Sequence, residues 1–197
     1  MNNQSYVSNQ LFTENIKLNL NEINTKNLNL KLYTKICEKI ENKCYKEGYI
    51  LKNSIKLVNK NLGKFINIDT NNYISYDLRF RATIFKPGVG DILECYIDNI
   101  NKLGIIAYIK YKDIIDDYTE NNGLDKSPLI IIIPNESIKD IEKYSITQKI
   151  KIIVKAVRFK FNTNKIQLVG NIDEQSWIIH YTLEDLKRRF FNIFIHN

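Results

Sequence analysis

The spacing of apolar residues predicts one strand and then one helix at the start of the chain. Apolar and polar side chains alternate in residues 11–20, which is typical of a strand with one buried face. Between residues 26 and 46 the apolar interval becomes about four, which predicts an amphipathic helix of about five turns. We expect Thr25 to cap its N-terminus and Gly48 to end it. Its apolar face would consist of Leu28, Leu32, Ile36, Ile40 and Cys44.

Further strands are predicted after the helix, in segments rich in aromatic and β-branched residues. Gly63 and the polar residues 69–72 supply the turns between them. The first module, residues 1–86, is therefore predicted to be an α+β domain with the order β-α-β-β-β. Its lysines are interpreted either as solvated surface or as part of a docking surface. The predicted strands are residues 49–58, 64–68 and 73–85.

A joint between two modules is predicted where the last of these strands ends. Pro87 has no backbone N–H and holds the residue before it in an extended conformation, so a regular strand should end there. The glycines just after it allow the chain to change direction. The residues assigned to the interdomain joint are Phe85, Lys86, Pro87, Gly88 and Gly90.

Residues 87–172 have the pattern of a small all-β domain. The strand-like segments are separated by the turns 101–104 and 162–164, by the acid-rich loop 113–125, and by a short helical turn that starts at Pro134. Five strands with a short helix after the third are typical of an OB-fold, a Greek-key barrel often used on oligonucleotides. The predicted strands are residues 91–100, 105–111, 129–133, 149–161 and 165–169.

The last segment, residues 173–197, returns to helical spacing. Its apolar face would hold Leu183, Leu186, Phe190 and Phe194, and phenylalanines on one helix face need to be buried. We expect a C-terminal helical extension that packs either on its own chain or on a partner.

The distribution of charged residues along the chain predicts a class of ligand. The chain has 197 residues and a formal net charge of +7, and the excess of Lys and Arg lies mainly in residues 1–85. In the second module no Asp or Glu occurs between Glu142 and Asp173. A basic strand pair of this kind favours a polyanion such as RNA. The cations in that interval are Lys143, Lys149, Lys151, Lys155, Arg158, Lys160 and Lys165.

The sequence lacks the motifs of a catalytic site. It contains no Ser-His-Asp order, P-loop or GxGxxG motif, and its two histidines lie in the tail. The three cysteines are odd in number and lack CxxC spacing, which argues against a disulfide framework and a zinc site. We expect no enzyme activity, no catalytic residue, no cofactor and no metal, in an intracellular protein of a reducing compartment. A polar N-terminus and the lack of a long apolar run predict neither a signal peptide nor a membrane span.

Aromatic and cationic side chains of the second module form the candidate RNA site. Lys149, Lys151 and Lys155 share one strand parity, whereas Arg158 and Lys160 share the other. The two tyrosines of the site either stack on bases or only cover the barrel surface. About four cations on RNA phosphates would give a slope of roughly −3 for log K against log salt. The residues assigned to RNA binding are Tyr96, Tyr108, Lys110, Lys149, Lys151, Lys155, Arg158 and Lys160.

The order of the elements and the residues at the joint resemble one family over residues 10–172. That family is subunit seven of RNA polymerase II, with its counterpart in the archaeal RNA polymerase and equivalents in large DNA viruses. Its pattern has a Leu-Phe first strand, a Gly-Tyr step, Phe-Arg-Pro, a Gly-acid pair, a second Gly and an Ile-Pro. The matching residues are Leu11-Phe12, Gly48-Tyr49, Phe85-Lys86-Pro87, Gly90-Asp91, Gly104 and Ile133-Pro134.

The resemblance implies a non-catalytic subunit of a DNA-directed RNA polymerase. It implies a tip domain that docks on the polymerase core through Leu62, Gly63 and Lys64, and a stalk barrel of the ribosomal S-one type near the RNA exit. The implied partners are the large polymerase subunits at the clamp base, a subunit-four-like protein, single-stranded nascent RNA and initiation factors, and no membrane. A cellular member would work in the nucleus, and a viral one in a cytoplasmic viral factory or the virion.

Two other function classes stay open from the sequence. One is a free OB-fold RNA-binding adaptor, such as an exosome cap subunit or a translation factor. The other is an assembly protein whose barrel contacts only protein. Co-purification separates the three classes, because each predicts a different set of partners.

Overall fold

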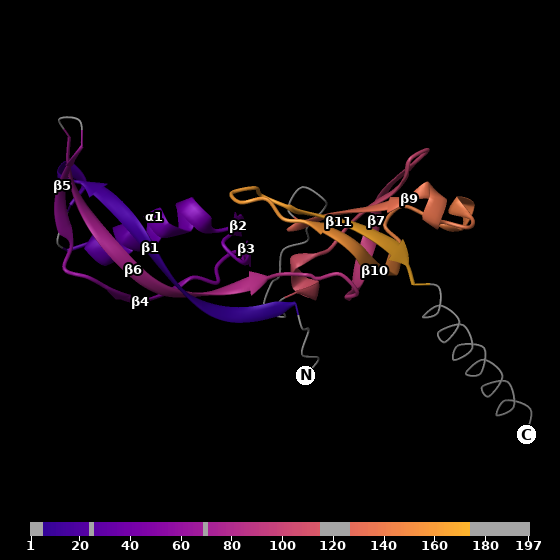
Figure 1. Cartoon of the computed structure of the whole chain (residues 1–197), viewed down its shortest axis with the longest axis horizontal. Coiled ribbons are helices and arrows are strands. Elements are labelled where there is room, and N and C mark those ends of the chain that lie inside the picture. Colours follow the sequence, from indigo (N-terminus) through magenta and orange to yellow (C-terminus); the bar gives the residue numbers. More distant parts are fainter. Residues whose placement is uncertain (1–5, 24–25, 69–70, 115–126, 174–197) are drawn as a thin grey trace, which may run out of the picture. The chain divides into compact units, whose positions relative to one another are not determined.

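The chain divides into two compact units in the computed structural model (Figure 1). The first unit contains the described residues up to Pro87 together with Arg158–Ile166. The second contains Gly88–Val157 and the described residues from Gln167 onward. The chain therefore passes from one unit to the other within the predicted joint, and a short segment after Val157 belongs to the first unit. The residues that the structure describes are 6–23, 26–68, 71–114 and 127–173.

The first unit is built around β6, a strand of 15 residues (Asn71–Phe85). β1 (Val7–Asn19) runs antiparallel along one side of it over all of its 13 residues (Figure 1). Three shorter strands pair in turn with the other side of β6, and β2 extends the sheet from β3. These strands are β2 (Cys44–Tyr45), β3 (Gly48–Ile50), β4 (Lys56–Lys60) and β5 (Lys64–Ile68).

One helix, α1 (Leu28–Ile40), packs its apolar stripe against this sheet. Leu32, Ile36 and Ile40 are buried, and they join Leu18 and Phe80 in a single core cluster. The apolar spacing of the sequence is confirmed for these helical positions, because residues four apart lie on one face of a helix.

A short 3-10 helix, η1 (Leu20–Glu22), comes before α1. Its capping box is closed by Asn19, whose backbone N–H donates to a carboxylate oxygen of Glu22 over 3.2 Å. The N-cap residue of α1 is Asn27, two residues after Thr25, and Thr25 itself lies outside the described residues.

The predicted helix is too long at its C-terminal end. It ends at Ile40 rather than at residue 46, and Cys44 lies in β2 instead of on the helix face. The backbone turns away at Asn42, which has a φ of 55°, a left-handed conformation that asparagine tolerates better than most residues. Gly48, which was predicted to end the helix, begins β3.

The prediction of one strand over residues 49–58 is also wrong. β3 ends at Ile50 and β4 begins at Lys56, and the chain between them makes a turn. Asn53 has a φ of 57°, and the Ser54 hydroxyl donates to the Leu51 carbonyl oxygen over 2.6 Å. Leu51 is nevertheless fully buried, so its apolar character reflects core packing and not a strand.

The second unit is a closed barrel of five strands in the order β10-β11-β9-β8-β7. The first strand of the barrel pairs with the second and the fourth, and the fifth lies between the third and the fourth. This order and the closure are consistent with the predicted OB-like barrel. The strands are β7 (Ile92–Asn101), β8 (Gly104–Tyr108), β9 (Leu129–Pro134), β10 (Lys149–Arg158) and β11 (Ile166–Ile172).

Strand alternation separates the barrel interior from its surface. Leu93, Cys95 and Ile97 of β7 are fully buried, and alternate residues of β10 from Ile150 to Val154 are buried as well. Because successive side chains of a strand point to opposite faces, the residues between them point outward. The polar and aromatic residues of β7 and β10 therefore lie on the outer surface.

Single-turn 3-10 helices join several barrel strands. The helical turn predicted after the third strand is confirmed at η4 (Asn135–Ser137). η2 (Tyr111–Asp113) follows β8, which ends at Tyr108 instead of at residue 111, and η5 (Ile141–Lys143) precedes β10. Most of the acid-rich loop and the helical extension from residue 174 lie outside the described residues, so their structures stay predictions.

The residues of the predicted joint make packing contacts and hydrogen bonds within their own units. In the first, Phe85 ends β6 fully buried, with its ring 5.5 Å from that of Tyr6 in an edge contact. In the second, the N–H of Gly88 donates to the Asp91 carboxylate over 2.7 Å, and Gly90 adopts a φ of 92°. The strand stops before Pro87, as expected from the missing N–H of proline.

Candidate functional site

Two tyrosines lie side by side on the barrel. Tyr96 of β7 and Tyr108 of β8 are direct cross-strand partners, and their ring centroids are 5.9 Å apart. The Lys110 ammonium lies 3.9 Å from the centroid of the Tyr96 ring, a cation–π contact. Burial raises the pKa of both phenols, and the neighbouring Asp113 carboxylate raises that of Tyr96 further. The structure therefore brings these three predicted site residues together, with Tyr96 half-buried and Tyr108 only 8% exposed.

Three lysines of β10 form the cation row, which we define as Lys149, Lys151 and Lys155. They occupy outward positions of that strand, and the first is the cross-strand partner of Tyr96. The Lys149 ammonium lies 2.5 Å from a carboxylate oxygen of Glu94, and the Lys151 ammonium lies 3.7 Å from the other. The hydrogen bond from Lys149 lowers the pKa of Glu94, and the same bond raises the pKa of Lys149. Cations and aromatic rings thus share one surface of the barrel.

Arg158, the last residue of β10, and Lys160 fall in the other compact unit from the cation row. Both are exposed, but they lie in the segment that is part of the first unit. Within that unit the segment is held by Cys44, which exchanges backbone hydrogen bonds of 2.8 Å with Asn162 and Thr163. The sequence predicted one RNA-binding set that combined Arg158 and Lys160 with the cation row, whereas the structure divides these five cations between the two units.

The barrel surface offers binding chemistry of a simple kind. Lysine ammonium groups can neutralise phosphates, and tyrosine rings can stack on bases.

Within the described residues no three or more His, Cys, Asp or Glu side chains gather as a metal site would require. Burial raises the pKa of the Cys95 thiol to about 12, which makes it a poor nucleophile at neutral pH. In the part of the chain that the structure describes, no helix is sufficiently long and apolar to span a membrane.

The predicted docking residues lie in the loop between β4 and β5. Leu62 is fully exposed, and Gly63 has a φ of 83°. A Cβ atom on Gly63 would lie 2.7 Å from a side-chain carbon of Tyr76, so the loop packs closely on β6. The Asn61 carboxamide oxygen accepts from the N–H groups of Gly63 and Asp77, each over 3.1 Å. The exposed leucine therefore sits on a loop that is held in a defined shape.

Apolar exposure continues on the strands beside this loop. We define the tip patch as Val58, Leu62 and Phe65, whose exposed fractions are 55%, 100% and 61%. The first and last of these were not predicted as docking residues. Phe65 pairs with Ile74 of β6, and three exposed large apolar side chains in the short segment from β4 to β5 indicate an interaction surface.

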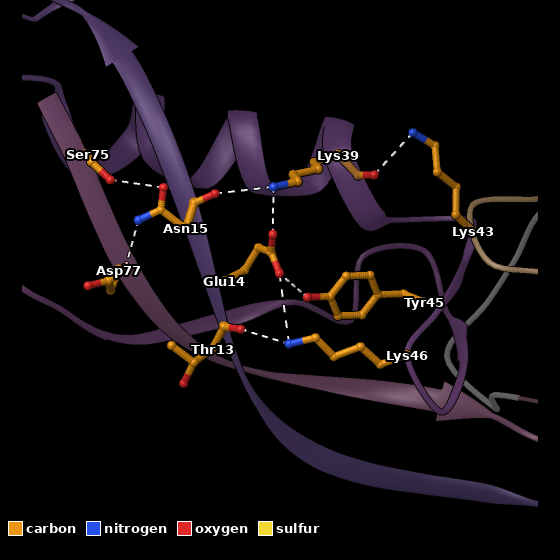
Figure 2. A network of polar contacts seen from close by, with 9 residues as sticks. All are labelled: Thr13, Glu14, Asn15, Lys39, Lys43, Tyr45, Lys46, Ser75 and Asp77. Carbon is orange, nitrogen blue, oxygen red and sulfur yellow. Dashed lines mark hydrogen bonds and ion pairs between the residues drawn. The ribbon is translucent and has the colours of Figure 1, made fainter. Parts of the chain in front are cut away.

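Sequence reasoning also missed a polar network around Glu14 (Figure 2). Its carboxylate accepts hydrogen bonds from the Tyr45 hydroxyl and from the Lys39 ammonium, the second over 2.6 Å. The Lys46 ammonium lies 3.8 Å from a Glu14 carboxylate oxygen and donates to the Thr13 carbonyl oxygen over 2.9 Å. The network ties β1, α1 and β2 to one another, and Figure 2 shows these side chains converging on the carboxylate. No local sequence pattern predicts such a network, because the residues that form it come from separate elements of the fold.

Replacing Glu14 with glutamine is expected to lower the free energy of unfolding by about 2 kcal/mol at pH 7. Burial tends to raise the pKa of Glu14, but the bonds from Lys39 and Tyr45 outweigh it and lower that pKa. A carboxyl with a lowered pKa contributes stability that is present above its ordinary pKa, and lost as pH falls through the folded value. The difference between the two proteins should therefore shrink in acid, which urea unfolding at several pH values would measure.

The matched control for this prediction is Glu38→Gln. Glu38 is exposed on the same helix as Lys39, so its replacement removes the same charge without touching the network. We expect a change within about 0.5 kcal/mol. A loss for Glu14→Gln that did not vary with pH would contradict the electrostatic explanation.

The comparisons with known proteins give a partial likeness. The chain matches no family model. DNA-directed RNA polymerase II subunit RPB7 of Glycine max is 25% identical to it over 83 residues. The aligned residues are 42% of this chain and 46% of that protein, so the chain spans less than half the length of the curated relative it matches. Over part of its length, the chain is thus similar to a subunit of an RNA polymerase.

Proposed function

We propose that this protein is a non-catalytic subunit of a DNA-directed RNA polymerase. The observation that carries the proposal is the partial similarity to subunit RPB7. A sheet-and-helix unit followed by a closed five-stranded OB-like barrel is compatible with it. The described residues offer a binding surface on each unit, which suits a subunit that connects partners.

Each unit has its own role in this proposal. The first unit docks on the polymerase core through Leu62, Gly63 and Lys64 and the rest of the tip patch. The second unit stands in the stalk and contacts nascent RNA through the cation row and the half-buried Tyr96, with Tyr108 packed beside it, and initiation factors bind nearby. Support for the first role comes from the exposure of Leu62 and Phe65 on and beside the loop between β4 and β5, where the Gly63 N–H donates to the Asn61 side chain. Support for the second comes from lysines and tyrosines on adjoining strands of the barrel.

Affinity purification of the tagged full chain from its native source, followed by mass spectrometry, tests the assembly. We expect the large polymerase subunits to co-purify at near-stoichiometric amounts. Recovery of ribosomal or exosome proteins without polymerase subunits would overturn the proposal and favour a free RNA-binding adaptor. A subunit-four-like protein among the partners would support placement in a stalk.

Removing the cation row is expected to weaken binding of single-stranded RNA about tenfold at low salt. The variant is Lys149→Gln, Lys151→Gln and Lys155→Gln combined, and all three lysines point outward, so the barrel should fold normally. Because each phosphate contact releases counterions, the slope of log K against log salt should become less negative by roughly two. Fluorescence anisotropy with an oligouridine across a salt series measures both quantities.

A triple variant of equal charge change controls for net charge. Lys102→Gln, Lys139→Gln and Lys143→Gln combined remove three cations of the same unit outside the cation row. This control should keep most of the affinity. If both triple variants lose affinity equally, binding is a property of overall charge and the proposed face is wrong.

A further inference from the structure

Glu94 lies between two members of the cation row. Lys151 is its direct partner across the β10–β7 pairing that closes the barrel, and Lys149 is the next outward residue. The two ammonium groups lie on opposite oxygens of one carboxylate, at 2.5 Å and 3.7 Å. About half of each of the three side chains is exposed, so the group is open to solvent and to a ligand.

This carboxylate holds the position that an RNA phosphate would need. A carboxylate and a phosphate diester are both anionic oxygen acceptors, and both take charge-assisted hydrogen bonds from lysine. A phosphate that approaches Lys149 or Lys151 must replace Glu94 or bind within a few ångströms of its negative charge. Either event reduces the net gain, because the ion pair is lost or the two anions repel.

Two other carboxylates influence this surface electrostatically. Asp113 raises the pKa of Tyr96 and also that of Lys149, and Asp98 raises the pKa of Tyr108. Glu94 is the carboxylate that the structure pairs with lysines of β10 in the described part of the barrel. Its contact with both ammonium groups places it where it can compete with another anion for them.

We propose that Glu94 is a built-in competitor of RNA phosphate, which keeps the cation row partly neutralised and makes RNA binding weak and readily reversible. This inference rests on the proposed RNA-binding function of the barrel and adds a residue that limits it. Among related complexes, a lower affinity mostly reflects faster dissociation. Weak binding would therefore let a transcript that moves past the surface be released quickly.

The test replaces Glu94 with glutamine in the full chain and measures binding to an oligouridine of about 12 nucleotides. We expect the affinity at low salt to rise about fivefold, and the slope of log K against log salt to become more negative by about one. The matched control is Glu136→Gln, which removes the same charge from an exposed residue of η4. A second variant, Glu94→Asp, shortens the side chain and should raise the affinity less.

A variant that lacks Lys149 and Lys151 tests whether Glu94 acts through these two lysines. In a Lys149→Gln and Lys151→Gln protein, adding Glu94→Gln should raise the affinity no more than Glu136→Gln does, since neither of the lysines that Glu94 pairs with is left to be released. A gain of about fivefold that persists in that background, or a gain in the otherwise unchanged protein that Glu136→Gln matches, overturns the inference. A loss of affinity in Glu94→Gln also overturns it, because Glu94 would then position the lysines for RNA.

The failure of this inference differs from the failure of the proposed function. If the variants at Glu94 bind like the wild type while loss of the cation row weakens binding, only the role of Glu94 is wrong. If the loss of the cation row has no effect, the RNA-binding face itself is wrong. Circular dichroism melting of every variant establishes that the compared proteins are folded.

Discussion

Replacing Gly104 with alanine should destabilise the barrel unit by about 3 kcal/mol or more. A Cβ atom there would lie 2.0 Å from the carbonyl oxygen of Ile133 and 2.8 Å from the backbone nitrogen of Asn135. Neither atom can move freely, because Gly104 is paired with Pro134 in the β8–β9 ladder and the Asn135 N–H donates to the Leu103 carbonyl over 3.0 Å. The φ of 135° adds strain for any side chain.

Hydrogen–deuterium exchange would measure this effect strand by strand. We expect the amides of β8 and β9 to lose protection in Gly104→Ala. The control is Gly90→Ala, where φ is 92° but an added Cβ would meet no atom within 4 Å. That variant should cost about 1 kcal/mol, the backbone penalty alone. Equal losses in the two variants would show that the contact with Ile133 is not the cause.

The second large effect is expected on assembly. For the proposed docking on a polymerase core, replacing Leu62 and Phe65 with aspartate should weaken association about thirtyfold or more, as for central apolar residues of an interface. Both side chains are mostly exposed, so the fold should tolerate the change. Quantitative co-purification with the large polymerase subunits, normalised to the amount of tagged protein, measures the loss.

A double variant on the barrel unit provides the comparison for this docking test. Val89→Asp and Leu103→Asp remove apolar side chains that are 71% and 84% exposed, and they add the same charge. We expect little change in recovery of the polymerase subunits. If recovery falls equally in both proteins, the tip patch is not the specific docking surface.

Much of the barrel could be predicted from the sequence because a strand has a period of two. Alternation alone assigns Ile105 and Ala107 to one face of β8, and both are fully buried. The same rule turns the cation row outward along β10. Local chemistry also locates the end of β6, since proline lacks the donor that a sheet needs.

The missed boundaries have a common cause. At Asn42 and Asn53 the chain turns through left-handed backbone conformations while apolar residues nearby stay buried. A pattern of apolar residues reports burial, and burial by itself does not distinguish a helix or a strand from a packed turn. The predicted helix and strand therefore ran past the residues where the backbone changes direction.

The sequence by itself determined the buried stripe of α1, the face of β8 that holds Ile105 and Ala107, where β6 ends and that a basic, carboxylate-free stretch follows Glu142. Only the tertiary structure decided which charges meet. Glu94 reaches Lys149 and Lys151 because β10 closes the barrel against β7 in one register, and Glu14 meets Lys39 and Tyr45 because α1 and β2 pack on β1. Such pairs join residues that are far apart in the chain. Their side chains come within contact distance only when the strands and helices pack against one another.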